Sequence, residues 1–216
     1  MKLPRPETET LSRSQKRRRD DIVQAALKIF DRDGFEAAKM TDIAREAEVA
    51  KGTLYLYFDT KIELLEAVIL TEIMPTLQKM GEVAQSKTGS ATDLLARQMR
   101  IAARRMASNE MASLLRHMVS GSSQHRRIIK LYYDNVVQSG IEHIKATLDY
   151  GVETGEFRQN IKDIDPLVLV GAHIYTAVWK ILFADLEELD IEKLVDDHLE
   201  LVLGGLLAYR QQDPTA

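Results

Sequence analysis

The sequence predicts an all-α fold, and three observations support that prediction. Apolar residues recur at the three- and four-residue spacing of amphipathic helices along most of the 216 residues. No stretch alternates apolar and polar residues for long enough to predict a strand, and no internal repeat is visible. Glycine, proline and aspartate stand where the helical stretches begin or end. We therefore expect about nine helices.

The composition narrows the class of protein. Apolar residues make up 45% of the chain and charged residues 29%, which allows a sizeable core beneath a charged surface. The absence of cysteine excludes disulfides, thiolate metal sites and a cysteine nucleophile, and it is typical of the reducing cytoplasm, where we expect the protein. No apolar run reaches the roughly 20 residues of a membrane span. The first 15 residues lack the apolar core of a signal peptide.

The net charge of −4 is unevenly distributed along the chain. Residues 1–61 contain 13 lysines and arginines against 11 acidic residues, whereas the remainder contains 16 against 22. The basic excess includes the run from Lys16 to Arg19. A basic N-terminal segment on an acidic body suits DNA binding, although a solvated charge run has the same composition.

The N-terminal helical stretches form a helix-turn-helix pattern. They comprise a helix at about 16–33, a short helix from Met40, a turn at 48–51 and a second short helix at 52–58. Leu54 and Phe58 are four residues apart, so both should pack on the preceding helix. That packing leaves Thr53, Tyr55 and Tyr57 off the apolar face. Aromatic and hydroxyl side chains beside lysines on a polar face predict a DNA-reading helix.

The rest of the chain also shows helical periodicity. Its predicted helices cover about residues 61–74, 80–84, 92–107, 109–120, 124–154, 166–184 and 190–208. Pro75 is expected to kink or end the first of these, because proline lacks the backbone donor and its ring clashes with the preceding turn. Asp165-Pro166 and Asp190 are predicted helix starts.

One motif resembles a known family. The matching residues are Ile43-Ala44, Val49, Lys51-Gly52-Thr53-Leu54-Tyr55, Tyr57-Phe58 and Lys61-Ile62-Glu63-Leu64-Leu65. They resemble the TetR family of transcriptional regulators over about residues 20–65, and the remainder is similar in length and helix order. Residues 1–14 are rich in proline, threonine, serine and glutamate, which predicts a disordered tail. The resemblance implies a three-helix helix-turn-helix domain at 15–60 and a helical effector-binding and dimerisation domain at 61–212.

The resemblance implies that the second short helix enters the DNA major groove. The expected DNA-binding residues are Lys16, Arg17, Arg18, Arg19, Lys39, Thr41, Lys51, Gly52, Thr53, Tyr55, Tyr57 and Lys61. Threonine and tyrosine hydroxyls mostly bond phosphates, which fixes register and carries little sequence information. Lys61 is expected to clamp a phosphate, because it stands at a helix start where backbone donors also favour an anion.

Two residues depart from the family pattern. Lys39 stands where threonine or serine usually caps the short helix, so we expect a weaker cap. Glu48 replaces a glycine in the turn, where a left-handed conformation at a non-glycine residue costs on the order of 1 kcal/mol.

The C-terminal helices predict a homodimer. The helices at 166–185 and 190–208 are too apolar to face solvent, and Gly171, Gly204 and Gly205 would allow backbones to approach closely. Helix-turn-helix proteins pair so that two reading helices meet two half-sites of a pseudo-palindromic operator in double-stranded DNA. We expect these two helices to form a four-helix bundle with their copies.

The same domain is expected to bind a small effector. The candidate residues are Met99, Met118, His117, Tyr132, Tyr133, His173 and Trp179. Methionine adapts to irregular ligands, although it is more often core. No acidic cluster argues for a metal and no arginine pair stands out for a phosphate, so we expect a largely apolar effector and no cofactor. The family implies repression, relieved when the effector shifts the population away from the DNA-binding conformation.

Other functions remain open at this stage. A helical-bundle enzyme would need a nucleophile motif or helical metal site, and the five histidines have no such partners. An activator or a nucleoid-organising protein would carry the same reading helix. A regulator controlled by a protein partner, with no effector, would have little or no pocket in its C-terminal domain.

Overall fold

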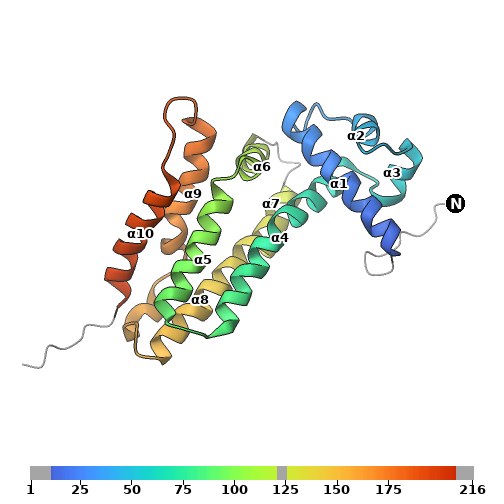
Figure 1. Cartoon of the computed structure of the whole chain (residues 1–216). Coiled ribbons are helices and arrows are strands. Elements are labelled where there is room, and N and C mark those ends of the chain that lie inside the picture. The colour runs from blue at the N-terminus through green and yellow to red at the C-terminus, as the bar shows by residue number, and fades with distance from the viewer. Residues whose placement is uncertain (1–10, 121–125, 208–216) are drawn as a thin grey trace, which may run out of the picture. The chain divides into compact units, whose positions relative to one another are not determined.

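The computed structural model describes residues 11–120 and 126–207, apart from the side chains of residues 117, 119, 120 and 162. Within these ranges the chain forms no strand, and its one extended pairing is an isolated bridge between Phe157 and Leu207. The helices are α1 (Arg13–Asp33), α2 (Met40–Glu46), α3 (Lys51–Tyr57), α4 (Lys61–Ser86), α5 (Ala91–Met106), α6 (Asn109–Ser120), α7 (Arg126–Tyr132), the π-helical segment η3 (Tyr133–Val137), α8 (Gln138–Glu153), the 3-10 helix η4 (Gln159–Asp163), α9 (Leu167–Leu182) and α10 (Ile191–Leu206) (Figure 1).

The all-α prediction is confirmed for the described residues. The α7, η3 and α8 segments follow one another without a gap, as the predicted helix at 124–154 requires. Counted as one helix, that run brings the described α-helices to nine. The predicted helix boundaries at 92–107 and 109–120 each agree with the structure to within about one residue.

The start of α1 is fixed by a capping box. The Ser12 hydroxyl accepts a hydrogen bond from the Gln15 backbone N–H at 3.3 Å, and Gln15 Oε1 accepts one from the Ser12 N–H at 2.9 Å. Two backbone donors that the helix leaves unpaired are thereby satisfied. Helix α1 consequently begins at Arg13, inside the segment predicted to be a tail. Residues 1–10 of that predicted tail lie outside the described residues.

The end of α1 agrees with the prediction. Gly34 has φ of 78°, a left-handed value that glycine adopts without strain, and its N–H donates to the Phe30 carbonyl at 3.0 Å. Phe35 folds back on the last turn, with its ring centroid 5.4 Å from that of Phe30. The chain therefore turns sharply toward α2.

The contacts divide the chain into two compact units. Unit 1 contains the residues up to Ile73 together with 117–132, and unit 2 contains 74–116 and the chain from Tyr133 onward. In unit 1, α1 packs on α2 and α2 on α3, whereas in unit 2 helix α5 packs against α8, α9 and α10. Helix α4 belongs to both units, so the domain limit proposed between residues 60 and 61 stays a prediction.

Helix α4 continues through Pro75, which we expected to end or kink it. The expectation of an end is wrong, and the helix proceeds to Ser86. A proline removes one backbone hydrogen bond from a helix. Apolar side chains are buried on both sides of it, Ile73 at 2% and Leu77 at 5% exposure, while the proline itself is exposed. Burial therefore outweighs the lost hydrogen bond.

Unit 2 has its core around α5. Buried side chains of α5, α8 and α10 meet there, including Leu95, Met99, Ala103, Ile144, Leu148, Val152, Val195 and Leu199. A buried amide ties three helices together, because Gln98 Nε2 donates to the Met80 carbonyl of α4 and to the His143 carbonyl of α8, both at 3.1 Å. Loss of this amide would leave two carbonyls without that donor.

A close approach explains the glycine near the end of α8. An ideal Cβ on Gly151 would lie 2.1 Å from Cδ2 of Phe157, a fully buried ring. Glycine is required for this ring to insert against the helix backbone.

The starts of the last two helices are capped by the predicted carboxylates. Asp165 Oδ1 accepts a hydrogen bond from the Leu167 N–H at 2.9 Å, and Asp190 Oδ1 accepts one from the Lys193 N–H at 3.0 Å. Both predicted helix starts are confirmed to within a residue. In the described part of the chain, no helix has the length and apolar character that crossing a membrane demands.

Candidate functional site

Helix α3 is anchored to its neighbours by two apolar side chains. Leu54 and Phe58 are buried, at 0% and 4% exposure, as their four-residue spacing predicts. Ile43 and Ala44 of α2 are buried as well, and the Val49 N–H donates to the Ala44 carbonyl at 2.9 Å. The position of α3 relative to α2 is therefore fixed by the packing of apolar side chains on both sides of the turn.

Both departures from the family pattern have structural consequences. Glu48 has φ of 53°, a left-handed conformation at a non-glycine residue, as expected. Its N–H donates to the Arg45 carbonyl at 3.1 Å. Lys39 is the N-cap of α2, and its side chain makes no capping hydrogen bond, which agrees with the weaker cap. The turn keeps its helix-turn-helix geometry at a small conformational cost.

The predicted DNA-binding side chains all belong to unit 1, and most of them are exposed. The exposed ones are Lys16, Arg17, Arg18, Lys39, Thr41, Lys51, Gly52 and Tyr55. Arg19, Thr53, Tyr57 and Lys61 are half-buried. An ideal Cβ on Gly52 would meet no atom within 4 Å, so the start of α3 is open to a large partner.

Three of these cations, Arg19, Lys51 and Lys61, lie over aromatic rings. The Arg19 guanidinium carbon lies 5.2 Å from the ring centroid of Phe58, and Lys51 Nζ lies 5.9 Å from that of Tyr55. Both distances fit a cation–π contact. Arg19 thus helps to pack α1 on the end of α3, whereas Lys51 and Tyr55 form one exposed pair on α3.

Lys61 is engaged within the protein. Its Nζ donates to the carbonyls of Glu36 at 2.9 Å and Ala38 at 3.0 Å, and to that of Phe35. The same ammonium lies 4.6 Å from the Phe35 ring centroid, and burial lowers its pKa from the usual value. An ammonium has three donors, and all three are used here. A phosphate contact by Lys61 would therefore require one of these bonds to break.

One exposed residue of α3 was not among the predicted contacts. Leu56 is 57% exposed, although it lies between Tyr55 and Tyr57 in the predicted reading helix. The sequence signal was present, because Leu56 falls outside the four-residue pair Leu54 and Phe58. An exposed apolar side chain on a reading helix fits contact with a thymine methyl group.

The predicted effector residues occur in both units. Met118 and Tyr132 belong to unit 1, and Met99, Tyr133, His173 and Trp179 to unit 2. Met99 is buried in the core, whereas Tyr133 is 51% exposed. The side chain of His117 lies outside the described residues.

Trp179 has a structural environment that the sequence did not reveal. Its ring lies between those of Tyr175 and Phe183, with centroids 5.9 and 5.1 Å away. Its indole N–H donates to the Glu187 carbonyl at 3.1 Å. This hydrogen bond ties α9 to the connection that follows it.

His173 combines deep burial with unpaired ring nitrogens. It is 3% exposed, and neither nitrogen has a hydrogen-bond partner among the described residues. The ring of His198 lies edge-on, with its centroid 5.5 Å away. Burial, assisted by His198, lowers the pKa of His173 to about 4. The imidazole is consequently neutral at physiological pH and offers a donor and an acceptor inside unit 2.

An arginine cluster on α5 corrects the expectation that no arginine pair stands out. Arg97, Arg100 and Arg104 are three and four residues apart, so they share one face of the helix. This spacing is visible in the sequence. No group of three or more histidine and carboxylate side chains able to hold a metal occurs within the described ranges.

The chain matches a family model described as bacterial regulatory proteins, tetR family, over residues 22–68. That range runs from the middle of α1 into α4 and includes the whole of α2 and α3. The motif that resembled the family in sequence and the part of the chain that forms the helix-turn-helix are therefore the same segment.

Relatives and solved structures extend the similarity to the rest of the chain. The HTH-type transcriptional regulator YfiR of Bacillus subtilis is 25% identical over 83% of this chain and 87% of its own length. The HTH-type transcriptional repressor KstR of Rhodococcus jostii is 41% identical, over 31% of each chain. The fold is similar to that of FadR from Bacillus subtilis in complex with stearoyl-CoA, with a TM-score of 0.69, 21% identity and coverage of 86% of this chain and 98% of that one.

Each of these relatives is a transcriptional regulator by its description. The family model matches the segment that contains α2 and α3, and the similarity of fold covers both units. With its helix-turn-helix, its all-α body and these similarities, the chain is a DNA-binding transcriptional regulator whose residues 22–68 match the TetR family.

Proposed function

We propose that the protein is a homodimeric repressor that binds a pseudo-palindromic operator in double-stranded DNA and leaves it when a small effector binds. The observation that carries this proposal is the arrangement of buried and exposed side chains on α3. Leu54 and Phe58 hold the helix from beneath, and Lys51, Tyr55 and Leu56 are exposed on it. A short helix presented in this way fits the major groove.

The proposed DNA contacts follow from exposure and charge. Lys16, Arg17 and Arg18 at the start of α1 supply phosphate contacts, and Lys39 and Thr41 do so at the start of α2. On α3, Lys51, Thr53, Tyr55 and Tyr57 approach phosphates or base edges. Gly52 allows the backbone to come close. Lys61 acts differently from the rest, because its ammonium holds the start of α4 against the residues before α2.

The proposed dimer interface is the outer face of α9. That face exposes a continuous set of large apolar side chains: Leu167, Val168, Ile174, Tyr175, Val178 and Leu182. Val168 is 67% and Leu182 61% exposed, and so large an apolar face is characteristic of an interface. On α10, Leu201, Gly204 and Gly205 extend it. The exposed side chains of the earlier turns of α10 are mostly acidic. We therefore propose that these turns contribute less to the dimer interface than the sequence led us to expect.

The proposed effector joins an apolar part to a polar one. The core of unit 2 and the unpaired nitrogens of His173 favour an apolar body with a few hydrogen-bonding groups. The ligand of the structural neighbour FadR, stearoyl-CoA, has this kind of chemistry. The proposed place of action is the cytoplasm, where we expected the protein from its lack of cysteine.

Selection from a library of random DNA duplexes tests this function. The purified protein should enrich sequences with two inverted half-sites, and footprinting should show their centres about 10 base pairs, or a multiple of that spacing, apart. Enrichment of a single unrepeated site would contradict the dimeric arrangement. No enrichment at all would contradict the proposed DNA-binding function.

A further inference from the structure

Unit 2 has a basic depression between the C-terminal half of α4 and the outer face of α5. Its volume is about 520 Å³. Five cations line it, Lys79, Arg97, Arg100, Arg104 and Arg105, together with the Ser108 hydroxyl, and no acidic side chain lines it. A second hollow of about 270 Å³ shares Lys79 and Arg97 with it. A concave surface with this many cations fits a compact anion.

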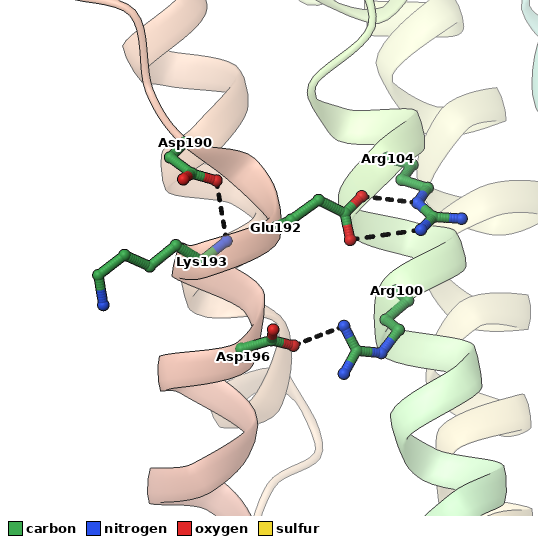
Figure 2. A network of polar contacts seen from close by, with 6 residues as sticks. All are labelled: Arg100, Arg104, Asp190, Glu192, Lys193 and Asp196. Atoms are coloured by element: carbon green, nitrogen blue, oxygen red, sulfur yellow. Dashed lines mark hydrogen bonds and ion pairs between the residues drawn. The ribbon is translucent and has the colours of Figure 1, made fainter.

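Two of the arginines are held by acids of α10. Figure 2 shows Arg100 and Arg104 of α5 directed at Asp196 and Glu192 of α10. Arg104 donates from Nε at 2.9 Å and from Nη2 at 3.3 Å to the two oxygens of Glu192, and Arg100 Nη1 lies 2.5 Å from Asp196 Oδ1. These ion pairs join the depression to α10.

The two acids leave part of the positive charge uncompensated. Among the described residues, Lys79 and Arg97 form no ion pair, and both are exposed. Like charges three or four residues apart on a helix repel each other, so Arg97, Arg100 and Arg104 would each be more stable beside an anion. A negatively charged ligand would give all three arginines an anionic partner, whereas α10 gives one only to Arg100 and Arg104.

The ion pairs with α10 are weak enough to be exchanged. The four side chains involved are between 38% and 66% exposed. Exposed ion pairs are screened by water and contribute little to stability. A phosphate group carries more charge than a carboxylate and accepts two parallel hydrogen bonds from one guanidinium. It would therefore compete well with Glu192 and Asp196.

We propose that this depression binds the diphosphate group of an organic effector, and that the diphosphate takes Arg100 and Arg104 from Asp196 and Glu192. The inference rests on the proposed effector response and names the chemistry that triggers it. Release of the two acids removes two ion pairs between α10 and α5, and α10 adjoins the proposed dimer interface through Leu201, Gly204 and Gly205. The ligand thus acts through its different affinity for the two arrangements of α10.

Duplex DNA is a less suitable occupant of the depression. The outer surface of α10 carries further acids beside Glu192 and Asp196, among them Asp197 and Glu200, both exposed. An extended polyanion lying across α5 would meet this negative surface, whereas a diphosphate confined to the depression would not. The charge pattern therefore favours a small ligand.

Calorimetric titration of the full-length protein in chloride buffer tests the proposal, with ADP as the probe. We expect ADP to bind at micromolar to millimolar concentration, and AMP to bind at least about tenfold more weakly because it lacks the second phosphate. Arg97→Gln should weaken ADP binding by about tenfold. Arg116→Gln removes an exposed arginine of α6 outside the depression and should leave ADP binding unchanged. Absence of ADP binding, equal binding of AMP, or an unaffected Arg97→Gln variant would overturn the proposal.

A second pair of variants tests the exchange itself. In Glu192→Gln/Asp196→Asn the competing carboxylates are gone, so ADP should bind about tenfold more tightly than to the wild type. Asp197→Asn is the matched control, because this acid pairs with Lys193 at 2.7 Å on the same helix and should change ADP binding little. Unchanged or weaker ADP binding by the double variant would overturn the exchange.

Operator binding without ADP separates this inference from the proposed function. A wild-type protein that binds its operator but not ADP contradicts the diphosphate site alone. A wild-type protein that binds no operator contradicts the proposed function, whatever the result with ADP. Loss of operator affinity in Arg97→Gln would show that the depression contacts DNA, which would also overturn the proposal.

Discussion

At the scale of single residues, His173 shows how burial sets chemistry. A buried imidazole without hydrogen-bond partners is stable in its neutral form, since a charge there would lack water and counterions. His198, whose pKa burial also lowers, is the nearest ring. The two histidines thus make the α9–α10 contact sensitive to acid.

This environment predicts a specific pH dependence of stability. The pKa of His173 is about 4 in the folded protein and 6.5 for an ordinary histidine. The unfolded chain therefore binds more protons than the folded protein between these pH values. The contribution of His173 to the free energy of unfolding, on the order of 3 kcal/mol, is present above pH 6.5 and lost as the pH falls toward 4. Urea unfolding of wild type and His173→Leu at pH 7.5 and pH 5 measures it.

The wild type should lose clearly more stability than His173→Leu between those two pH values. Leucine has a similar volume and does not titrate, so the comparison isolates the imidazole. Equal losses in the two proteins would show that His173 is not the acid-sensitive group.

At the scale of elements, Lys61 determines how α4 joins the DNA-reading helices. Its ammonium was expected to bind a phosphate, but it donates to three backbone carbonyls that lie just before α2. Helix α4 is continuous from Lys61 to Ser86, so it connects this contact to unit 2. Lys61 is in this account a positioning residue, and its test has to distinguish that role from a phosphate contact.

The salt dependence of operator binding makes the distinction. Lys61→Met should lower stability by about 1–3 kcal/mol, because three hydrogen bonds from a charged donor are lost. It should weaken operator binding without changing the slope of log Kd against log salt. Lys51→Met should reduce that slope by about one unit, because it removes a proposed phosphate contact. A reduced slope in Lys61→Met would restore Lys61 as a phosphate contact.

The elements also show what the sequence could and could not predict. Helix ends were predictable because capping is local: Gly34, Asp165 and Asp190 act on residues within one turn. The continuation of α4 through Pro75 was not, because burial of Ile73 and Leu77 depends on distant partners.

The same difference applies to the candidate site. The buried pair Leu54 and Phe58 followed from helical spacing. The engagement of Lys61 did not, since its carbonyl partners lie 23 to 26 positions earlier in the chain. The α5 arginines shared a visible spacing, but their meaning depends on Glu192 and Asp196, which lie some ninety residues away in the sequence and are placed by folding.

At the scale of the whole molecule, the dimer can be tested through a glycine. An ideal Cβ on Gly171 meets no atom of its own chain within 4 Å, and an alanine in a helix is about 1 kcal/mol more favourable than glycine. Gly171→Ala should therefore leave the monomer as stable as before or more so. If α9 packs closely on its copy, the added methyl groups should raise the dimer dissociation constant by at least about tenfold.

Sedimentation equilibrium measures that constant, and Gly140→Ala is the matched control. A Cβ on Gly140 lies at an ordinary 3.9 Å from Leu77 within unit 2, so this change should leave the dimer intact. An unchanged dissociation constant in Gly171→Ala would move the interface away from this part of α9.

The proposed function requires α3 to be the DNA-reading helix, and the operator affinity of a double variant tests that role most directly. Thr53→Ala/Tyr55→Phe removes two hydroxyls from α3 without touching the buried Leu54 and Phe58. Thr88→Ala/Tyr133→Phe makes the same changes at exposed residues outside α1–α3. We predict that the first variant binds the selected operator at least about tenfold more weakly and that the second binds like wild type. Equal affinity of all three proteins would contradict the assignment of α3 as the reading helix.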